Sequence, residues 1–112
     1  MTIHEKTVDD VMILSIKGSI MSEPDAARFR TVIYGVLEKD FRKVVVDIAR
    51  VDRMNSTGLG AIMAAMTSVK TRGGELCIAR ASNKTSPLFM VTKLVRVLKL
   101  YESVDKAVAG FK

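Results

Sequence analysis

The chain has 112 residues, of which 48% are hydrophobic and 27% are charged, a composition typical of one soluble globular domain. Its apolar runs are far shorter than the ~20 residues of a membrane-spanning helix, and its first residues are acidic where a secretory signal would be basic, so we expect a cytoplasmic protein without membrane insertion. The net charge is +6, but the 18 Lys and Arg residues are scattered, which favours a solvated basic surface, equally usable by an acidic protein partner, over direct binding of nucleic acid.

The N-terminal region contains two runs of β-forming residues, Ile3–Val8 and Val11–Lys17. The polar pair Asp9-Asp10 separates them and is typical of a tight turn. The pattern predicts a hairpin whose two strands form an antiparallel edge of a sheet.

A helix is predicted next, within "MSEPDAARFRTVIYGVLEKD". Ser22 is a suitable N-cap, Pro24 suits the first turn, and Asp25 stands three residues after Ser22, as in a capping box. The helix has one apolar face, which predicts that it packs against another layer. This face consists of Phe29, Val32, Ile33, Val36 and Leu37.

The central region predicts a strand, a helix and a second strand. The run "KVVVDI" has β-branched residues at consecutive positions, which favours a central strand of a largely parallel sheet, buried on both faces. The helix runs from about Thr57 to Arg72 and ends at Gly73-Gly74. The run "ELCIA" is another buried strand, and Cys77 within it is interpreted as a buried structural thiol.

The C-terminal third predicts three short elements. A helix within "SNKTSPLFMVTKL" begins near Ser82 or, with Pro87 in its first turn, near Ser86. The run "VLKLY" predicts a final strand, and "SVDKAVAGF" predicts a helix capped by Ser103. The chain is therefore one α/β domain over residues 1–112, with the order ββαβαβαβα and a mixed, largely parallel sheet.

Several kinds of catalytic site are not indicated. The only histidine, His4, lies about fifty residues before the serine-containing loop, so a Ser/His hydrolase is disfavoured. The chain has no nucleophile-elbow, dinucleotide-binding or phosphate-loop motif, and no cluster of residues at metal-ligand spacing. We predict no catalytic residue, metal or cofactor.

A phospho-aspartate receiver is a competing interpretation, because Asp47 lies near the end of the central strand predicted at "KVVVDI", as a receiver's acceptor would. Receivers hold Mg²⁺ with an acidic pair at the carboxyl end of the first strand, whereas Asp9-Asp10 precedes the strand "VMILSIK". We therefore predict a structural role for Asp47, as an acceptor of hydrogen bonds from the loop that follows it.

The helix from Thr57 has two unlike sides. Leu59, Ile62, Met63, Met66 and Val69 share the side expected to face the core. The opposite side has small, uncharged residues, which allow close approach of another surface and indicate a docking face. These are Gly60, Ala61, Ala64, Thr67, Ser68 and Thr71. The alternative is that another part of the same domain covers this side.

The helix is preceded by more capping residues than it needs. Asn55, Ser56 and Thr57 are all good N-cap residues, but one helix uses one cap. A hydroxyl is thus left at the positive end of the helix dipole. A phosphate there would add a charge of about −1.5 to −2 at the rim of the docking face and could prevent binding. The sequence also fits N-x-[ST], but glycosylation requires a secretory route that we do not expect here.

The segment "VVVDIARVDRMNSTGLGAIMAAMTSVKTRGGELCIA" resembles the STAS domains, and within them the bacterial anti-sigma-factor antagonists. Their hallmark is a strand ending in Asp, a short loop and D-S-[ST]-G-L-G opening a helix. "MILSIKGSI" and "LFMVTKLVRVLKLYES" extend the similarity across the chain. The resemblance implies that Ser56 is the phospho-acceptor, with Thr57 as second choice, and that Gly58 and Gly60 are the motif glycines.

The resemblance also implies a mechanism of partner switching. The unphosphorylated antagonist binds a serine-kinase anti-sigma factor and frees the sigma factor. The kinase then phosphorylates the serine with ATP, which is the kinase's own ligand, and a metal-dependent serine phosphatase resets the system. The expected partner-binding residues are Asn55, Ser56, Thr57, Gly58, Gly60, Ala61, Ala64 and Ser68.

Two positions depart from the family pattern. Asn55 stands where the family usually has Asp, and Ile20 and Met21 stand where an acidic residue usually follows the glycine after the second strand. STAS-like domains also serve as subunits of lipid-transport ABC complexes and as appendages of anion transporters; the lack of a membrane span disfavours only the last for this chain. A non-phosphorylated transport subunit therefore stays open as an alternative, as do a weak homodimer and an enzyme with Ser56 as nucleophile.

Overall fold

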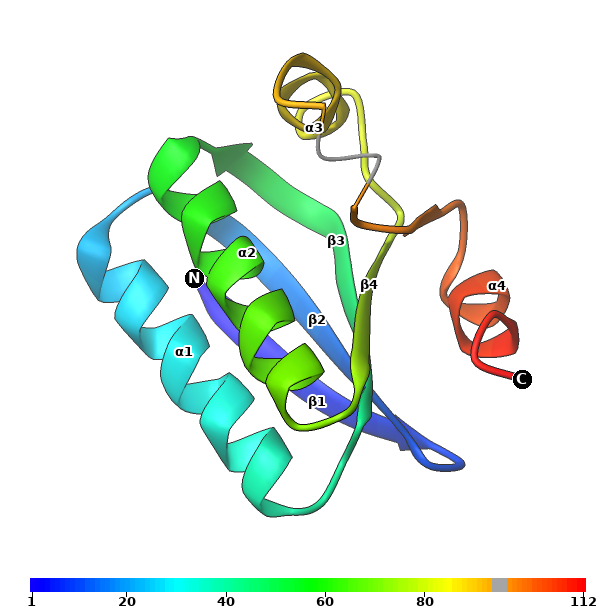
Figure 1. Cartoon of the computed structure of the whole chain (residues 1–112). Coiled ribbons are helices and arrows are strands. Elements are labelled where there is room, and N and C mark those ends of the chain that lie inside the picture. Colours follow the sequence, from blue (N-terminus) through cyan, green and yellow to red (C-terminus); the bar gives the residue numbers. More distant parts are fainter. Residues whose placement is uncertain (94–96) are drawn as a thin grey trace.

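A five-stranded sheet forms the centre of the domain, and its strands lie side by side in chain order, β1-β2-β3-β4-β5 (Figure 1). The structure is a computed structural model and describes residues 1–93 and 97–112. The elements are β1 (Thr2–Val8), β2 (Val11–Ile20), α1 (Glu23–Glu38), β3 (Lys43–Met54), α2 (Ser56–Thr71), β4 (Glu75–Ala79), α3 (Ser86–Val91), β5 (Leu100–Tyr101) and α4 (Val104–Ala109). The predicted order ββαβαβαβα is confirmed.

The first two strands pair antiparallel, and the other neighbouring strands pair parallel. Val8 pairs with Val11, so Asp9 and Asp10 form the two-residue turn between the strands. Asp9 has a φ of 53°, a left-handed conformation that aspartate tolerates better than most residues. The predicted hairpin and antiparallel edge are therefore confirmed.

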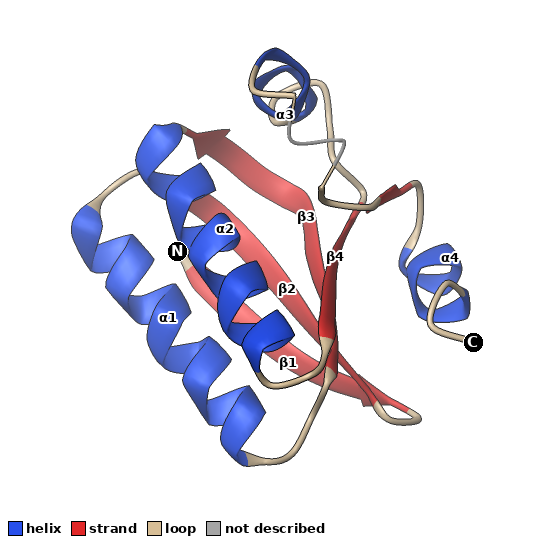
Figure 2. Cartoon of the chain, viewed as in Figure 1, coloured by secondary structure: helices blue, strands red, loops and turns tan. Residues whose placement is uncertain are grey.

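The helices cover the two faces of the sheet unequally (Figure 2). α1 and α2 lie over one face and enclose the larger core, and α4 lies over part of the other. Val44 and Val46 of β3 face the larger core, while Val45 between them faces α4. All three side chains are fully buried, which confirms that the β-branched run is a central strand covered on both faces.

The start of α1 follows the sequence prediction with one difference. The Ser22 hydroxyl accepts a hydrogen bond from the Asp25 amide at 3.3 Å, and Pro24 lies in the first turn. The Asp25 carboxylate accepts from the amide of Met21 at 3.2 Å, one residue before the usual capping-box partner. This bond is the main reason why the pKa of Asp25 lies below its ordinary value.

The C-terminal elements are shorter than their predicted runs. α3 begins at Ser86, the later of the two predicted starts, because the fully buried Thr85 accepts the Ser82 amide through its hydroxyl and holds residues 82–85 in a turn. Its predicted last residue, at position 94, lies outside the described residues. β5 contains only Leu100 and Tyr101, since these alone pair with β4.

Two smaller predictions concern the end of the chain and the cysteine. Ser103 caps α4 by accepting the Lys106 amide at 3.1 Å, as predicted. Cys77 is buried, and its burial raises the pKa of the thiol to about 12, in keeping with a structural residue. Among the described residues, no helix is long and apolar enough to cross a membrane.

Candidate docking site at the start of α2

Asn55 is the residue that caps α2. Its side-chain oxygen accepts hydrogen bonds from the amides of Thr57 at 3.0 Å and Gly58 at 3.1 Å. Its side-chain nitrogen donates to the carbonyl of Met21 at 3.0 Å, a bond that an aspartate could not make. Asn55 therefore caps the helix and ties it to the loop between β2 and α1, and the helix begins at Ser56 rather than Thr57.

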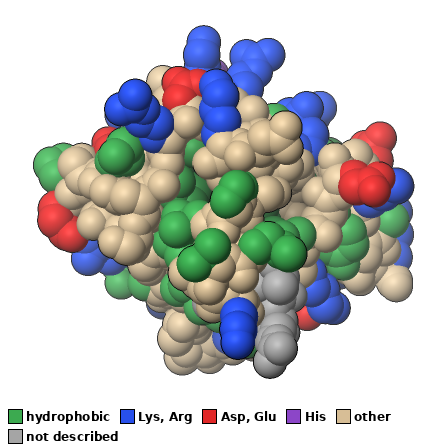
Figure 3. Space-filling view, turned by 90° about the horizontal axis from the view of Figure 1, so that it is seen from above, with side chains coloured by type: hydrophobic (Ala, Val, Ile, Leu, Met, Phe, Trp, Pro, Cys, Tyr) green, Lys and Arg blue, Asp and Glu red, His purple; other side chains and the backbone are tan. Residues whose placement is uncertain are grey.

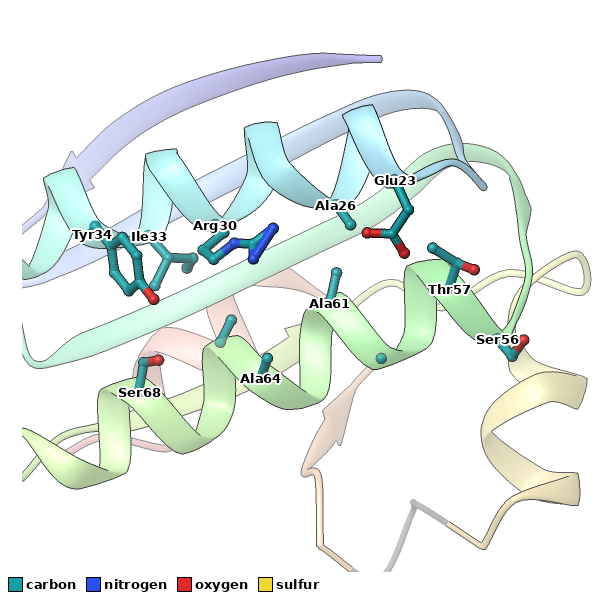
Figure 4. A pocket seen from close by; sticks show the side chains of 12 residues that line it. Glu23, Ala26, Arg30, Ile33, Tyr34, Ser56, Thr57, Ala61, Ala64 and Ser68 are labelled. Carbon is teal, nitrogen blue, oxygen red and sulfur yellow. The ribbon is translucent and has the colours of Figure 1, made fainter.

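The two hydroxyl residues after the cap have different surroundings. Ser56 is exposed at the tip of the helix, whereas Thr57 is half-buried. Figure 4 shows Thr57 on the side toward α1, opposite Glu23, and Ser56 at the helix end. Among the described residues no hydrogen bond is found for the Ser56 hydroxyl, and the first turn of α2 has no acidic residue. The Ser56 hydroxyl is therefore accessible at the positive end of the helix.

The two glycines of the loop motif differ in what surrounds them. Gly58 is buried, and a Cβ added there would overlap the Ile20 carbonyl oxygen and lie 3.0 Å from the Met54 Cγ. Gly60 is exposed, and a Cβ added there would meet nothing within 4 Å. Gly58 thus allows α2 to lie directly on the end of β2, while Gly60 leaves open space outside the helix.

A groove of about 310 Å³ runs between α1 and α2 (Figure 4). Its α2 wall consists of small residues, and its α1 wall has larger and charged ones. The residues of the groove are Glu23, Ala26, Arg30, Ile33, Tyr34, Ser56, Thr57, Gly60, Ala61, Ala64, Ala65 and Ser68. The structure thus brings six of the eight expected partner-binding residues to one groove. The other two do not line it: Asn55 caps α2, and Gly58 packs against Ile20 at the end of β2.

The two sides of α2 are as unlike as the sequence indicates. Leu59, Ile62, Met66 and Val69 are buried in the larger core, and Met63 is half-buried against it. On the other side, Gly60, Ala64, Thr67 and Thr71 are exposed, and only Ala61 and Ser68 are half-buried. α1 therefore borders this side of α2 and leaves most of it uncovered.

Sequence reasoning missed the α1 wall of the groove. Arg30 and Tyr34 are exposed, and each looked like an ordinary solvated helix position. The one available signal in the sequence is that Tyr34, a large side chain, directly follows Ile33 of the predicted apolar face; in the structure it is 49% exposed.

Asp47 accepts a hydrogen bond from a residue that follows it, as predicted, although that residue lies in β3 and not in a loop; its other partners, Arg80 and Ser15, were not predicted. It lies within β3, which continues to Met54, and its carboxylate accepts two hydrogen bonds from Arg80, at 3.0 and 2.6 Å, and one from the Ala49 amide at 3.1 Å. Because the side chain faces away from α1 and α2, it does not bond to the Asn55 loop. Asp47 instead joins β3 to the residue after β4, and this bond raises the pKa of Arg80.

The fold and this site define a class of protein. A mixed sheet in the order β1 to β5, with a capped serine loop opening α2 beside a groove, is the arrangement expected of a STAS domain. The family model described as "STAS domain" matches residues 2–107, so the chain belongs to the STAS domain family.

Individual relatives agree with this assignment. A protein of Thermotoga maritima named "Putative anti-sigma factor antagonist" is 27% identical over 103 residues, which cover 91% of this chain and 90% of the relative. The crystal structure of a protein described as a "putative anti-sigma factor antagonist", also from Thermotoga maritima, superposes on this chain with a TM-score of 0.86 at 25% identity. The superposition covers 96% of this chain and 92% of that one.

Two more distant structures share the fold. The Bacillus cell fate determinant SpoIIAA in its phosphorylated form superposes with a TM-score of 0.75 at 13% identity, covering 99% of this chain and all of that one. A sulfate transporter family protein from Wolinella succinogenes superposes with a TM-score of 0.79 at 22% identity, covering 93% of this chain and 86% of that one. At these identities the likeness extends to the fold alone.

Proposed function

We propose that this protein is an anti-sigma-factor antagonist whose docking surface is the groove between α1 and α2 and whose switch is Ser56. The observation that carries the proposal is that Asn55 provides the helix cap, so the exposed Ser56 hydroxyl is left for modification. The name of the Thermotoga maritima relative supports the same function. In this function the chain binds partners and carries out no chemistry of its own.

The mechanism follows from where a phosphate would lie. Unphosphorylated, the groove accepts a serine-kinase anti-sigma factor, which then releases its sigma factor. The kinase transfers a phosphoryl group from its own ATP to Ser56, adding a charge of about −1.5 to −2 at the rim of the groove. Repulsion and bulk then separate the two proteins, and a serine phosphatase restores the binding form.

Ser56 suits this role better than Thr57. A phosphate on Thr57 would enter the half-buried side of the helix opposite the Glu23 carboxylate, where like charges repel. A phosphate on Ser56 would stand at the exposed helix tip next to Asn55, which is neutral. The replacement of the family's usual Asp by Asn55 therefore keeps the cap without placing a negative charge beside the phosphate.

The switch is tested by incubating the protein with a cognate serine kinase and ATP and locating phosphate by mass spectrometry. We expect modification of Ser56 in the wild type and in Thr57→Ala, and none in Ser56→Ala. Absence of phosphate on both Ser56 and Thr57 would overturn the switch.

The docking surface is tested with two variants and a matched control. Ala64→Arg fills the groove and Ser56→Asp adds charge at its rim, so each should abolish binding to the kinase partner. Ala27→Arg, an equally large change at an exposed position of α1 outside the groove, should leave binding intact. Retained binding in both groove variants would contradict the proposed surface.

A second candidate function is a non-phosphorylated subunit of a lipid-transport ABC complex, in which Asn55 would cap α2 in the same way and Ser56 would serve only as a contact. Co-purification of an ABC ATPase instead of a kinase would support it. A third candidate, an enzyme with Ser56 as a nucleophile, is disfavoured because the single histidine, His4, lies with Asp47 and Arg80 on the sheet face away from Ser56. We therefore expect no labelling of Ser56 by serine-directed electrophiles.

The oligomeric state is a separate question. Sedimentation of the purified chain tests for a weak homodimer.

A further inference from the structure

The sheet face opposite α1 and α2 has a polar surface of its own. α4 packs through Ala107 and Val108 on residues of this face such as Ile13 and Val45. Beyond that cover, the strand register places His4, Ser15 and Asp47 side by side across β1, β2 and β3, with Lys17 and Arg50 in the next row. These residues, with Ile16 and Arg80, line an open hollow of about 360 Å³.

Arg80 is a cation held in a fixed position in this hollow. Its Nε and Nη2 donate to the carboxylate of Asp47, which is 4% exposed, while the Arg80 side chain is 47% exposed. A guanidinium has five N–H groups, so the remaining ones are left for another acceptor. Because the buried carboxylate fixes the group, an incoming anion would not have to order it.

Lys17 and Arg50 line the same hollow as Arg80, and Lys6 lines an adjoining hollow that Arg80 also borders. None of the ion pairs found in the described part of the chain includes Lys6, Lys17 or Arg50. On this face the carboxylate of Asp47 is matched by Arg80. Glu5 pairs with Lys39, and Asp105 of α4 lines the adjoining hollow together with Lys6 and Arg80. In the view from above, several Lys and Arg side chains gather along one margin of the molecule (Figure 3).

The spacing of these cations indicates the size of the ligand. Lys6 pairs with Ile13 on β2, and Lys17 lies four residues further along that strand. At about 3.3 Å per residue, the two positions are about 13 Å apart along the sheet. An extended peptide of about four residues spans that length and can place a carboxylate beside each lysine, which a single phosphate centred on either position would not do.

We propose that the open face of β1, β2 and β3, defined by Lys6, Lys17, Arg50 and Arg80, binds an extended acidic segment of a partner protein. The segment lies along β2, with its carboxylates on the two lysines and the two arginines. This face is separate from the groove that contains Ser56, so a partner held here would stay bound when the switch is phosphorylated. The contact is electrostatic and weakens with salt.

The test uses the full chain and a fluorescein-labelled octaglutamate peptide, followed by fluorescence anisotropy at low salt. The double variant Lys17→Glu/Arg50→Glu should weaken binding about tenfold, since two exposed charge contacts are reversed. The matched control Lys70→Glu/Arg72→Glu makes the same change in net charge at the far end of α2 and should lower affinity by less than about twofold. An equal loss in both variants would show attraction to net charge only and would overturn the site.

Further measurements separate this proposal from the switch and from other anions. Ser56→Asp should bind the peptide as the wild type does, because Ser56 lies in the groove between α1 and α2. This result is expected whether or not a kinase phosphorylates Ser56. Amide NMR shifts should appear on β1 and β2 and not at the α1–α2 groove; the reverse pattern would overturn the site.

Two other anions test the chemistry of the ligand. Inorganic phosphate should displace the labelled peptide only at concentrations far above those at which the unlabelled peptide does. Binding of phosphatidylserine vesicles without binding of the peptide would assign the face to a membrane surface instead.

Discussion

The two sides of α2 differ in how much change they tolerate. On the inner side Gly58 lies against the Ile20 carbonyl oxygen, and Ile62 is fully buried. On the outer side Gly60 and Ala64 border an open groove. Small residues therefore occur on both sides for opposite reasons: inside, the space is already filled, and outside, it is left empty. The same residue type can mark a packing constraint or a docking surface, and substitutions tell the two apart.

The largest expected difference is at Ile62. Ile62→Ala removes a fully buried side chain and leaves a cavity, so the free energy of unfolding should fall by about 2–5 kcal/mol. Ala64→Ser, two residues on and exposed, should change it by less than about 0.5 kcal/mol. Urea unfolding followed by circular dichroism measures both, and similar losses would contradict the two-sided description of α2.

The two motif glycines give the next largest difference. Gly58→Ala places a methyl group against backbone at Ile20, and the shift this forces should cost about 1–3 kcal/mol. Gly60→Ala adds a methyl group in open space and removes a flexible residue from a helix, so it should stabilise by about 0.5–1 kcal/mol. Opposite signs are expected in the unfolding midpoints, and a stable Gly58→Ala protein would show that α2 can shift away from β2.

The helix cap tests how the inner side is anchored. Asn55→Ala removes the acceptor of two backbone amides and should destabilise by about 1 kcal/mol. Asn55→Asp keeps that acceptor and loses only the bond to the Met21 carbonyl, so its loss should be smaller. Chemical denaturation compares them; equal losses would mean that the Met21 contact, and not the cap, is the important one.

The smallest expected effect is a pH dependence of the free energy of unfolding, which arises from Asp25 at the start of α1. The pKa of Asp25 is lowered in the folded state, first by the hydrogen bond from the Met21 amide. Its stabilising contribution is thus present above its ordinary pKa of 3.8 and is lost as the pH falls through the lower folded value. The difference in urea midpoint between wild type and Asp25→Asn should shrink from neutral pH to about pH 3. A difference that is constant with pH would contradict this assignment.

Much of the fold can be predicted from short stretches of sequence, because the types of neighbouring residues decide where strands and turns form. The β-branched run before Asp47 is buried on both faces, and the Asp9-Asp10 turn forms a hairpin. For α3 the local sequence left two starts open, and the burial of Thr85 decides for the later one, Ser86. The ion pair of Asp47 with Arg80 joins residues 33 positions apart, and nothing in the local sequence indicates it.

The site was predictable on one side only. The small face of α2 can be derived from helical periodicity, but the choice of cap cannot, because Asn55, Ser56 and Thr57 are locally equivalent as caps. The Met21 carbonyl, which is distant in sequence, is the partner that favours Asn55. The α1 wall of the groove depends on how two helices lie together, which periodicity does not describe.

The order of the strands has a consequence for how the chain reaches this structure. Each strand lies beside the strand before it, from β1 to β5, and none is inserted between two earlier ones. The sheet can therefore grow at one edge while the chain is synthesised, and each new strand finds its partner already in place. The two-residue β5 and the six-residue α4 join last and have the least to hold them. Their amides should exchange with solvent before those of β2 and β3, through local opening that leaves the groove and Ser56 undisturbed.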